Sequence, residues 1–233
     1  MDIVKLFSVS QGMSAIQRYS QLHLLKSESV MEHTGFVCLF TYTLCEEINS
    51  ASAPNDKLDV GMALQKAIVH DIDEVITGDI PRPTKYYSDE SVAVFKKIAE
   101  AGIDQIINEL RINSRNMKTN WEQSKTGKEG MIVALADLSS VIYKLWEEIL
   151  MLGNKKLFRQ ANEVKTFLGD FQDKITEGGW FDPAQKHIID VALDQLYTIL
   201  NEISKSSDPI HGTFKTFEVI DERKKYGTPQ NKI

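Results

Sequence analysis

Proline, glycine and cysteine are scarce in this chain of 233 residues, which has 6 Pro, 13 Gly and 2 Cys. Two cysteines are too few for a disulfide scaffold or for a four-cysteine zinc module. Few helix breakers are present, and no alternating run of Val, Ile or Thr bounded by turn dipeptides indicates a strand. These absences, with apolar residues recurring at helical spacing, predict an all-α protein.

Long apolar runs and a surplus of basic charge are also missing. The longest uncharged apolar run, 131–136, is far shorter than the roughly 20 residues that a membrane span needs. The 27 Lys+Arg against 33 Asp+Glu give a net charge of −6, which argues against binding to a nucleic-acid polymer. The first residues include the charged Asp2 and Lys5 and no extended apolar segment. We therefore expect no secretory signal and a cytoplasmic protein.

Helical patterns cover most of the chain up to residue 203, and we predict one domain over 1–203 with a polar, partly extended tail over 204–233. A first helix is expected from about Ser14 to Leu25. A second begins at Ser29, where the spacing of Ser29 and Glu32 is that of a capping box. The most apolar helix, Met131 to Leu152, should lie centrally. The polar stretch 111–130 is expected to be a long exposed loop, a kind of segment that often carries function.

Two histidines and two aspartates stand where their chemistry needs an explanation. His33 lies in the first turn of a predicted helix, and His70 ends an apolar run and is followed at once by Asp71. A single buried histidine is more often a hydrogen-bonded core residue than a ligand. Asp137, however, lies inside an apolar helix, and burying its charge costs several kcal/mol unless a cation or hydrogen bonds compensate it. Either a salt bridge to Lys or Arg or a bound metal ion would do so.

A metal site made of these four residues has a definite character. Neighbours on a helix point about 100° apart, so His70 and Asp71 can converge only where the helix ends. Two nitrogens and two oxygens leave coordination positions for water and for a phosphate oxygen. This donor set suits Mn, Co, Fe, Ni or Mg better than a closed structural zinc.

The same four residues match the H…HD…D pattern of HD-domain metal-dependent phosphohydrolases. The chain also resembles, more closely, the bacterial YfbR-type 5′-deoxynucleotidases, through Arg18, the pair Glu32-His33 and the block from His70 to Lys85. Ala136-Asp137-Leu138 follows at a similar offset. The resemblance covers roughly Ser14 to Glu148, and the block from His70 to Lys85 makes it specific, whereas a bare HD dipeptide would not.

The resemblance implies an HD-domain helical bundle with one divalent ion (Co, Mn, Zn, Ni, Fe or Mg) on His33, His70, Asp71 and Asp137. It implies that Arg18 orients the phosphate and that Glu74 takes part in catalysis. The nucleotide would be contacted by Arg18, Tyr19, Asp79, Ile80, Pro81, Arg82 and Lys85. Arginine is a bidentate phosphate donor, and Glu74 lies one turn after His70. Glu74 could act on the attacking water or protonate the leaving oxygen, and Asp79 could accept from the sugar 3′-OH.

Two departures from the family pattern bear on the substrate. Tyr19 stands where the bacterial nucleotidases have Trp, and Arg82 stands between two prolines where they have a small hydroxyl residue. We expect a homodimeric 5′-nucleotidase that hydrolyses deoxynucleoside 5′-monophosphates. Because Arg82 could reach further phosphates, a deoxynucleoside triphosphate triphosphohydrolase is the alternative. A metal-stabilised nucleotide sensor without turnover is disfavoured by the presence of both Arg18 and Glu74.

Overall fold

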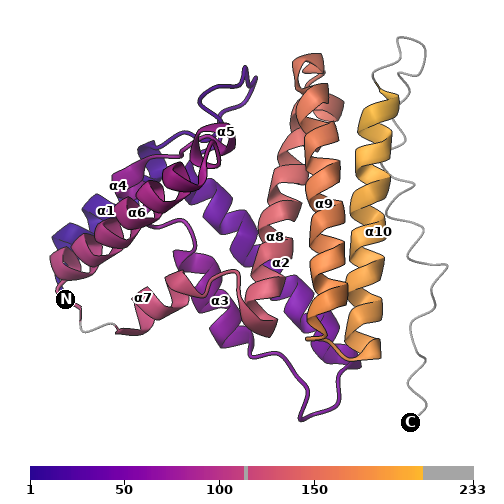
Figure 1. Ribbon diagram of the computed structural model, residues 1–233, viewed down its shortest axis with the longest axis horizontal. Helices are drawn as coiled ribbons and strands as arrows, with labels where there is room; N and C mark the ends of the chain where they lie inside the picture. Colours follow the sequence, from indigo (N-terminus) through magenta and orange to yellow (C-terminus); the bar gives the residue numbers. More distant parts are fainter. Residues whose placement is uncertain (113–114, 207–233) are drawn as a thin grey trace.

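The computed structural model describes residues 1–112 and 115–206, and this part of the chain is helical, with no strand (Figure 1). The predicted all-α fold class is therefore confirmed. The elements are α1 (Ile3–Ala15), α2 (Val30–Ala51), α3 (Val60–Val69), α4 (Glu74–Thr77), α5 (Arg82–Lys85), α6 (Asp89–Leu110), α7 (Arg115–Glu122), α8 (Gly127–Trp146), the π-helix η1 (Glu147–Met151), the 3₁₀-helix η2 (Lys155–Leu157), α9 (Phe158–Gly178) and α10 (Pro183–Lys205).

The larger hydrophobic core lies among α2, α8, α9 and α10, with α8, α9 and α10 side by side in Figure 1. Helix α8 supplies side chains with almost no exposed surface, among them Ile132, Leu135 and Ile142, which confirms the predicted central helix. It starts at Gly127, earlier than expected, and passes without a break into the π-helix η1. Gly153 follows at a φ of 75°, a backbone conformation that favours glycine, and the helix ends there.

A second core lies among α1, α6 and the segment from the end of α3 into α4, and includes Val9, Val69, Ile103 and Ile106. The predicted helix from Ser14 to Leu25 is wrong, because α1 already ends at Ala15 and a loop follows. We call residues 16–29 the site loop. An isolated antiparallel bridge between Gln17 and Ser29 closes its base, so its apolar side chains reach the cores from a loop instead of a helix face.

The connection 111–130 is more ordered than its sequence predicts, because it contains α7. The indole N–H of Trp121 on α7 donates to Asp73 Oδ1 at 2.7 Å. This bond fixes α7 against the turn between α3 and α4, and the short segment 123–126 then leads into α8. The expected long exposed loop thus contains the helix α7, which is followed by the turn 123–126.

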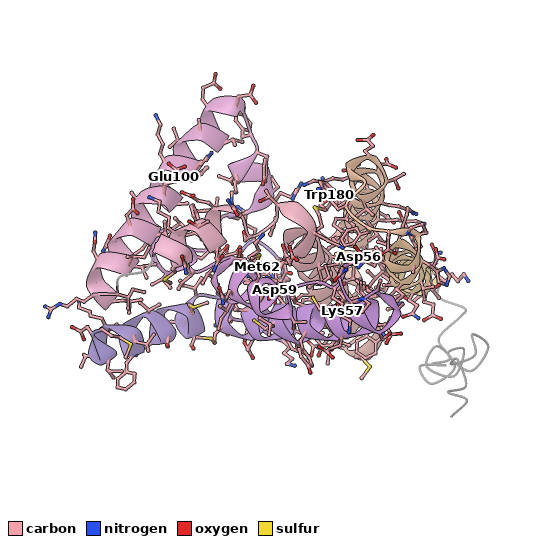
Figure 2. All side chains as sticks on the ribbon, turned by 90° about the horizontal axis from the view of Figure 1, so that it is seen from below. Asp56, Lys57, Asp59, Met62, Glu100 and Trp180 are labelled. Atoms are coloured by element: carbon pink, nitrogen blue, oxygen red, sulfur yellow. The ribbon has the colours of Figure 1, made fainter. Side chains whose placement is uncertain are left out.

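The start of α10 is fastened to the connection between α2 and α3. The buried side chain of Gln185 donates to Ser52 Oγ at 2.8 Å and to the backbone oxygen of Asp56 at 2.7 Å. Figure 2 labels Asp56, Lys57 and Asp59 along this connection, seen from below. Asp59, in the same connection, caps α3. The connection therefore fixes the position of α10 relative to α3, the helix that leads to His70.

The predicted tail over 204–233 begins inside a helix, since α10 runs to Lys205. Residues 207–233 lie outside the described part of the chain. Within 1–112 and 115–206, no helix combines the length and the apolarity that crossing a membrane requires.

Candidate active site

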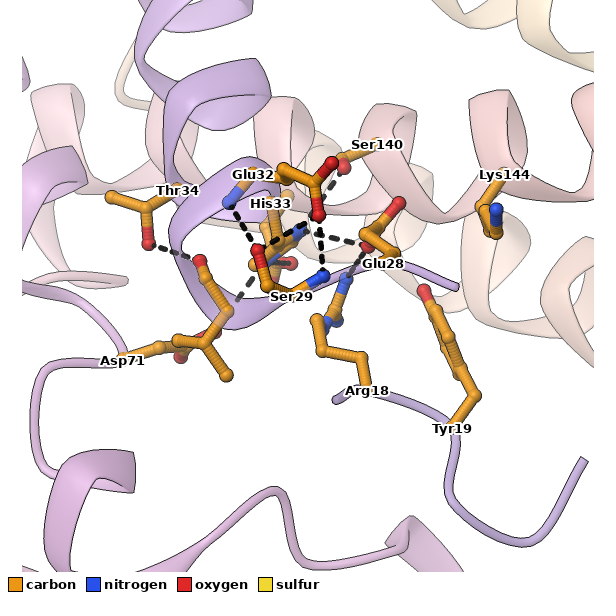
Figure 3. Close-up of polar contacts among 12 residues, drawn as sticks. Arg18, Tyr19, Glu28, Ser29, Glu32, His33, Thr34, Asp71, Ser140 and Lys144 are labelled. Carbon is orange, nitrogen blue, oxygen red and sulfur yellow. Dashed lines mark hydrogen bonds and ion pairs between the residues drawn. The ribbon is translucent and has the colours of Figure 1, made fainter. Parts of the chain in front are cut away.

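His33 is placed by the capping box that begins α2. Ser29 Oγ accepts from the Glu32 N–H at 3.2 Å, and Glu32 Oε2 accepts from the Ser29 N–H at 2.7 Å, as the sequence predicts. This fixes His33 in the first turn, where it is fully buried. Its Nδ1 hydrogen-bonds Ser140 Oγ of α8 at 3.0 Å (Figure 3). The other ring nitrogen, Nε2, is left to face the cluster described next.

His70 and Asp71 converge because α3 ends at Val69 and the chain turns. The Nδ1–H of His70 donates to the backbone oxygen of Ala67 at 2.7 Å. A carbonyl oxygen only accepts, so the proton of the neutral ring is on Nδ1 and the lone pair of Nε2 points inward. A backbone hydrogen bond of this kind fixes the tautomer of many metal-binding histidines.

Four side chains meet at this point, and we call them the His–Asp cluster: His33, His70, Asp71 and Asp137. The Nε2 atoms of His33 and His70 are 3.2 Å apart, and Asp71 Oδ2 lies 3.3 and 3.1 Å from them. Asp137 Oδ1 lies 3.2 Å from His33 Nε2. Ligands bonded to one ion at about 2.0–2.2 Å, at 90–110° to one another, are separated by about 2.8–3.6 Å. The spacing of His33, His70 and Asp71 therefore fits one metal ion, and these three residues form a mutual ligand group. Asp137 is not part of that group and is tied to it through His33.

Of the two interpretations that the sequence left open for Asp137, the structure shows the salt bridge, and its partner is Lys125. While Oδ1 faces His33, Oδ2 forms an ion pair with the ammonium group of Lys125. Burial works against the charges, yet Lys125 and His33 hold the pKa of Asp137 well below its ordinary value. Against the same burial effect, Asp137 and Asp71 raise the pKa of Lys125. Sequence reasoning missed Lys125, because nothing local distinguishes it from Lys118 or Lys128.

Arg18 is held beside the cluster by Glu28, a second residue that sequence reasoning missed. Its Nη1 forms an ion pair with Glu28 Oε1 at 2.7 Å, and the two side chains are only 10% and 4% exposed (Figure 3). The same Glu28 oxygen is 4.0 Å from His33 Nδ1. The guanidinium also lies over the ring of Tyr19, at 4.7 Å from its centroid. The site loop thus brings an arginine and an aromatic ring to the buried end of α2.

Buried polar atoms without a partner gather at this site. Among the described residues five such side-chain atoms are found, and three of them are Arg18 Nε, Tyr19 Oη and Glu74 Oε2. Buried polar atoms in native proteins are nearly always hydrogen-bonded, and exceptions ask for an explanation such as a ligand. Their concentration around the His–Asp cluster is what a site that binds a polar ligand would show.

Glu74 is the first residue of α4 and shares a pocket wall with His70 and Asp71. Burial, with the neighbouring charges of Asp71 and Asp79, raises the pKa of Glu74 to about 9. The carboxyl group therefore carries a proton at neutral pH in this arrangement. A buried carboxylic acid of this kind can donate a proton to a reacting group.

Most of the remaining predicted site residues lie in the segment after α4, and their contacts differ from one residue to the next. Asp79 accepts the backbone N–H of Tyr19 at 2.7 Å, and Ile80 and Pro81 are half-buried in the link to α5. The guanidinium of Arg82 is stacked over the rings of Tyr86, at 4.8 Å, and of Phe167 on α9, at 4.2 Å. Arg82 is thus engaged with two aromatic rings, and within the described part of the chain it forms no hydrogen bond or ion pair with the His–Asp cluster.

A pocket of about 520 Å³ opens beside the cluster. Lys85 lines it, whereas Arg82 does not. Its wall is made by residues from the turn after α3 and from α5, α6, α7 and the turn before α8: His70, Asp71, Asp73, Glu74, Lys85, Tyr86, Lys96, Ala99, Glu100, Trp121, Glu122, Ser124 and Lys125. Two aromatic rings and several charged groups around one volume suit a small polar molecule with a flat ring.

Comparison with known sequences gives one consistent family. The family described as 5′-deoxynucleotidase YfbR-like matches residues 5–176. A 5′-deoxynucleotidase of Shewanella oneidensis is 28% identical over 204 residues, covering 86% of this chain and 97% of the relative. A 5′-deoxynucleotidase of Vibrio vulnificus is 30% identical over 174 residues, covering 68% of this chain and 88% of the relative.

Solved structures agree on the fold. A conserved hypothetical protein of Pyrococcus furiosus superposes with a TM-score of 0.64 at 21% identity, covering 84% of this chain and 99% of that one. An HD-domain phosphohydrolase of Listeria innocua superposes with a TM-score of 0.62 at 19% identity, covering 88% and 99%. At these identities the likeness concerns the helical architecture alone.

Proposed function

Because the chain belongs to the YfbR-like 5′-deoxynucleotidase family, a family of phosphate-monoester hydrolases, we propose that it removes the 5′-phosphate from deoxynucleoside monophosphates. The observation that carries the proposal is the convergence of the His–Asp cluster beside Arg18 and Glu74. A cation site, a buried phosphate donor and a protonated acid are the parts that hydrolysis of a phosphate ester uses.

The His–Asp cluster would hold one divalent ion. When bound, such an ion supplies an activated water and neutralises charge on the phosphate. Three of the four proposed ligands have outer contacts that hold them, since Ser140 orients His33, the Ala67 carbonyl orients His70, and Lys125 holds Asp137. Outer contacts of this kind fix ligand direction and basicity.

Arg18 and Glu74 would act on the substrate itself. Arg18 has an unpartnered Nε beside its ion pair with Glu28, so it can donate to phosphate oxygens while Glu28 keeps it in place. Glu74, whose pKa is raised by burial and by Asp71 and Asp79 in the metal-free protein, would give a proton to the leaving 5′ oxygen as the ester bond breaks. The Tyr19 ring and the aromatic wall of the pocket offer faces for the nucleoside.

The charges around the pocket favour one phosphate over three. Besides the cluster and Glu74, its wall carries three lysines (Lys85, Lys96 and Lys125) and three carboxylates (Asp73, Glu100 and Glu122). No cationic surplus is therefore present to compensate two further phosphate groups. The guanidinium of Arg82, which could have supplied one, is stacked on Tyr86 and Phe167.

A substrate panel tests the proposal. The protein loaded with Mn or Co is offered each deoxynucleoside monophosphate, ribonucleoside monophosphate and deoxynucleoside triphosphate, with His33→Ala as the inactive control. Release of inorganic phosphate from dAMP or another deoxynucleoside monophosphate is expected. Tripolyphosphate from dATP, with no turnover of monophosphates, would overturn the proposal in favour of a triphosphohydrolase. Binding without any turnover would indicate a sensor.

Three further expectations accompany this function as predictions. They are a cytoplasmic location, a homodimer, and one domain over 1–203 followed by a tail over 204–233. Sedimentation of the full chain checks the homodimer. Limited proteolysis checks the domain boundary, with a protected core ending near Lys205 as the expected result.

A further inference from the structure

Lys125 holds a position that no motif in the sequence points to. It lies in the turn between α7 and α8, and its ammonium group forms an ion pair with Asp137 Oδ2. Its side chain is 45% exposed and forms part of the pocket wall that also includes His70, Asp71 and Glu74. Lys125 therefore joins the His–Asp cluster to the open pocket.

The two oxygens of the Asp137 carboxylate have different partners, and this fixes where the ammonium group of Lys125 lies. Oδ1 is directed at His33 Nε2, 3.2 Å away, and Oδ2 is taken by Lys125. The Asp137 carboxylate thus lies between the ammonium group and the point where the side chains of the cluster meet. A lysine ammonium has three N–H donors, and the bond to Asp137 uses one of them.

The other two lysines of the pocket are placed differently. Lys96 on α6 has a side chain that is 73% exposed and pairs at 3.9 Å with Glu100, on the same helix. Lys85 belongs to the short helix α5. Among the lysines that line the described pocket, Lys125 is the one with an ion pair to a residue of the cluster. A phosphate at the cluster would therefore find Lys125 as the adjacent cation on this side.

We propose that Lys125 is a phosphate-binding residue of this site, which contacts the substrate's phosphate oxygens while it holds Asp137. The inference rests on the proposed function as far as the substrate is a phosphate ester. Arg18 approaches from the site loop and Lys125 from the turn before α8, so the phosphate would be held by cations from two separate segments. A phosphate between fixed cations is bound more tightly and in one orientation.

A purely structural ion pair is the competing interpretation. In that case Lys125 would serve only to orient Asp137, and its loss would weaken ion binding without changing phosphate binding once the ion is present. The two interpretations therefore differ in one measurable quantity, which is the affinity of the ion-loaded protein for inorganic phosphate.

The test compares Lys125→Met and Lys125→Arg with the wild-type chain, and Lys128→Met serves as the control. Lys128 lies three residues further on, donates to the backbone oxygen of Asp56 and is outside the pocket. Calorimetry first measures Mn²⁺ affinity, and then phosphate affinity at saturating Mn²⁺. We expect Lys125→Met to weaken phosphate binding by about 10- to 100-fold, the range for a charged hydrogen bond. Lys125→Arg should retain most of the affinity, and Lys128→Met should match wild type.

Unchanged phosphate affinity in Mn²⁺-loaded Lys125→Met would overturn the proposal, as would an equal loss in Lys128→Met. If Lys125→Met and Lys125→Gln both fail to bind Mn²⁺ at saturating concentration, Lys125 serves ion binding and the proposal is also wrong. Because the ligand is inorganic phosphate, these results do not depend on which nucleotide is hydrolysed. Failure of the substrate panel and failure of this proposal are therefore distinguishable.

Discussion

The backbone N–H of Tyr19 donates a 2.7 Å hydrogen bond to Asp79 Oδ2, which joins the site loop to the turn after α4. Tyr19 has a φ of 60°, in the left-handed region that non-glycine residues seldom adopt. An external acceptor helps to hold such a conformation. Asp79 therefore fixes the backbone that carries Arg18 and Tyr19, a role separate from the sugar contact that the family resemblance implies for it.

Substitution of Asp79 tests this link. Asp79→Ala removes the acceptor, and we expect kcat/KM for deoxynucleoside monophosphates to fall by about tenfold or more, since a hydrogen bond to a charged group contributes about 1.5–3 kcal/mol. Asp79→Asn keeps an acceptor oxygen and should recover part of the loss. Steady-state kinetics of both variants measure the effect, and identical kinetics in Asp79→Ala and wild type would contradict it.

Glu148 anchors the far side of the site loop. This fully buried carboxylate accepts the backbone N–H groups of Leu25 and Lys26, each at 2.8 Å, and the side-chain amide of Asn154, also at 2.8 Å. It belongs to the π-helix η1, and π-helical turns in α-helices are frequent at functional sites. The anchor lies on an element different from the one that carries Asp137, so it can be altered separately.

For Glu148→Gln we expect faster hydrogen exchange at the amides of Leu25 and Lys26, a higher KM, and a free energy of unfolding lower by about 1–3 kcal/mol, because a buried N–H loses its acceptor. Hydrogen-exchange mass spectrometry and denaturant unfolding measure these changes. The matched control is Glu163→Gln, at a half-exposed carboxylate paired with Arg159. If exchange in the site loop stays at the wild-type rate, Glu148 is not its anchor.

The raised pKa of Glu74, about 9, gives the metal-free protein a distinct pH dependence. The unfolded chain releases this proton near pH 4.3, so between about pH 5 and pH 9 the folded protein binds more protons than the unfolded one. The free energy of unfolding should therefore fall as the pH rises through this range. Glu74→Gln should lose this contribution and gain stability over wild type at high pH.

Denaturant unfolding of the metal-free wild type and of Glu74→Gln, at about pH 6 and pH 9, checks the sign. In the ion-loaded protein the same variant should bind nucleotide but turn it over about 10²- to 10⁴-fold more slowly, the usual cost of losing an acid–base group. Parallel pH curves for the two metal-free proteins would show that Glu74 does not titrate in this range.

Removal of Asp137 should separate ion binding from folding. Asp137→Ala takes one ligand from the cluster, so we expect weaker metal affinity. The partner left behind, Lys125, is half-exposed and can turn its ammonium group to water, so the fold should be kept. Metal content by elemental analysis and far-UV circular dichroism measure both effects. Wild-type metal content in the purified variant would exclude Asp137 as a ligand.

Substitution of Arg82 should have little effect on catalysis. Its guanidinium is stacked on Tyr86 and Phe167, so Arg82→Thr should leave kcat/KM for monophosphates nearly unchanged. The lost cation–π contacts should lower the free energy of unfolding by about 0.5–1 kcal/mol. A loss of monophosphate hydrolysis of about 100-fold or more, on the scale of removing a charged hydrogen bond to the substrate, would instead place Arg82 at the phosphate.

The sequence by itself determined the parts of this protein that depend on neighbours along the chain. The capping box of Ser29 and Glu32 involves residues three apart, and the end of α3 at His70 lets two consecutive side chains converge. The motif block from His70 to Lys85 indicated the family. Asp137 was notable because a carboxylate in an apolar helix demands a cation, whichever elements supply it.

Only the tertiary structure decided which distant groups meet. Lys125, Glu28 and Glu148 act through partners on other elements, and nothing in their local sequence marks them. The predicted helix over the site loop failed because its apolar residues have near-helical spacing, whereas the bridge between Gln17 and Ser29 and the packing against two cores fix a loop there. Local hydrogen bonds are encoded by spacing, but long-range ion pairs and stacking depend on how packing brings the helices together.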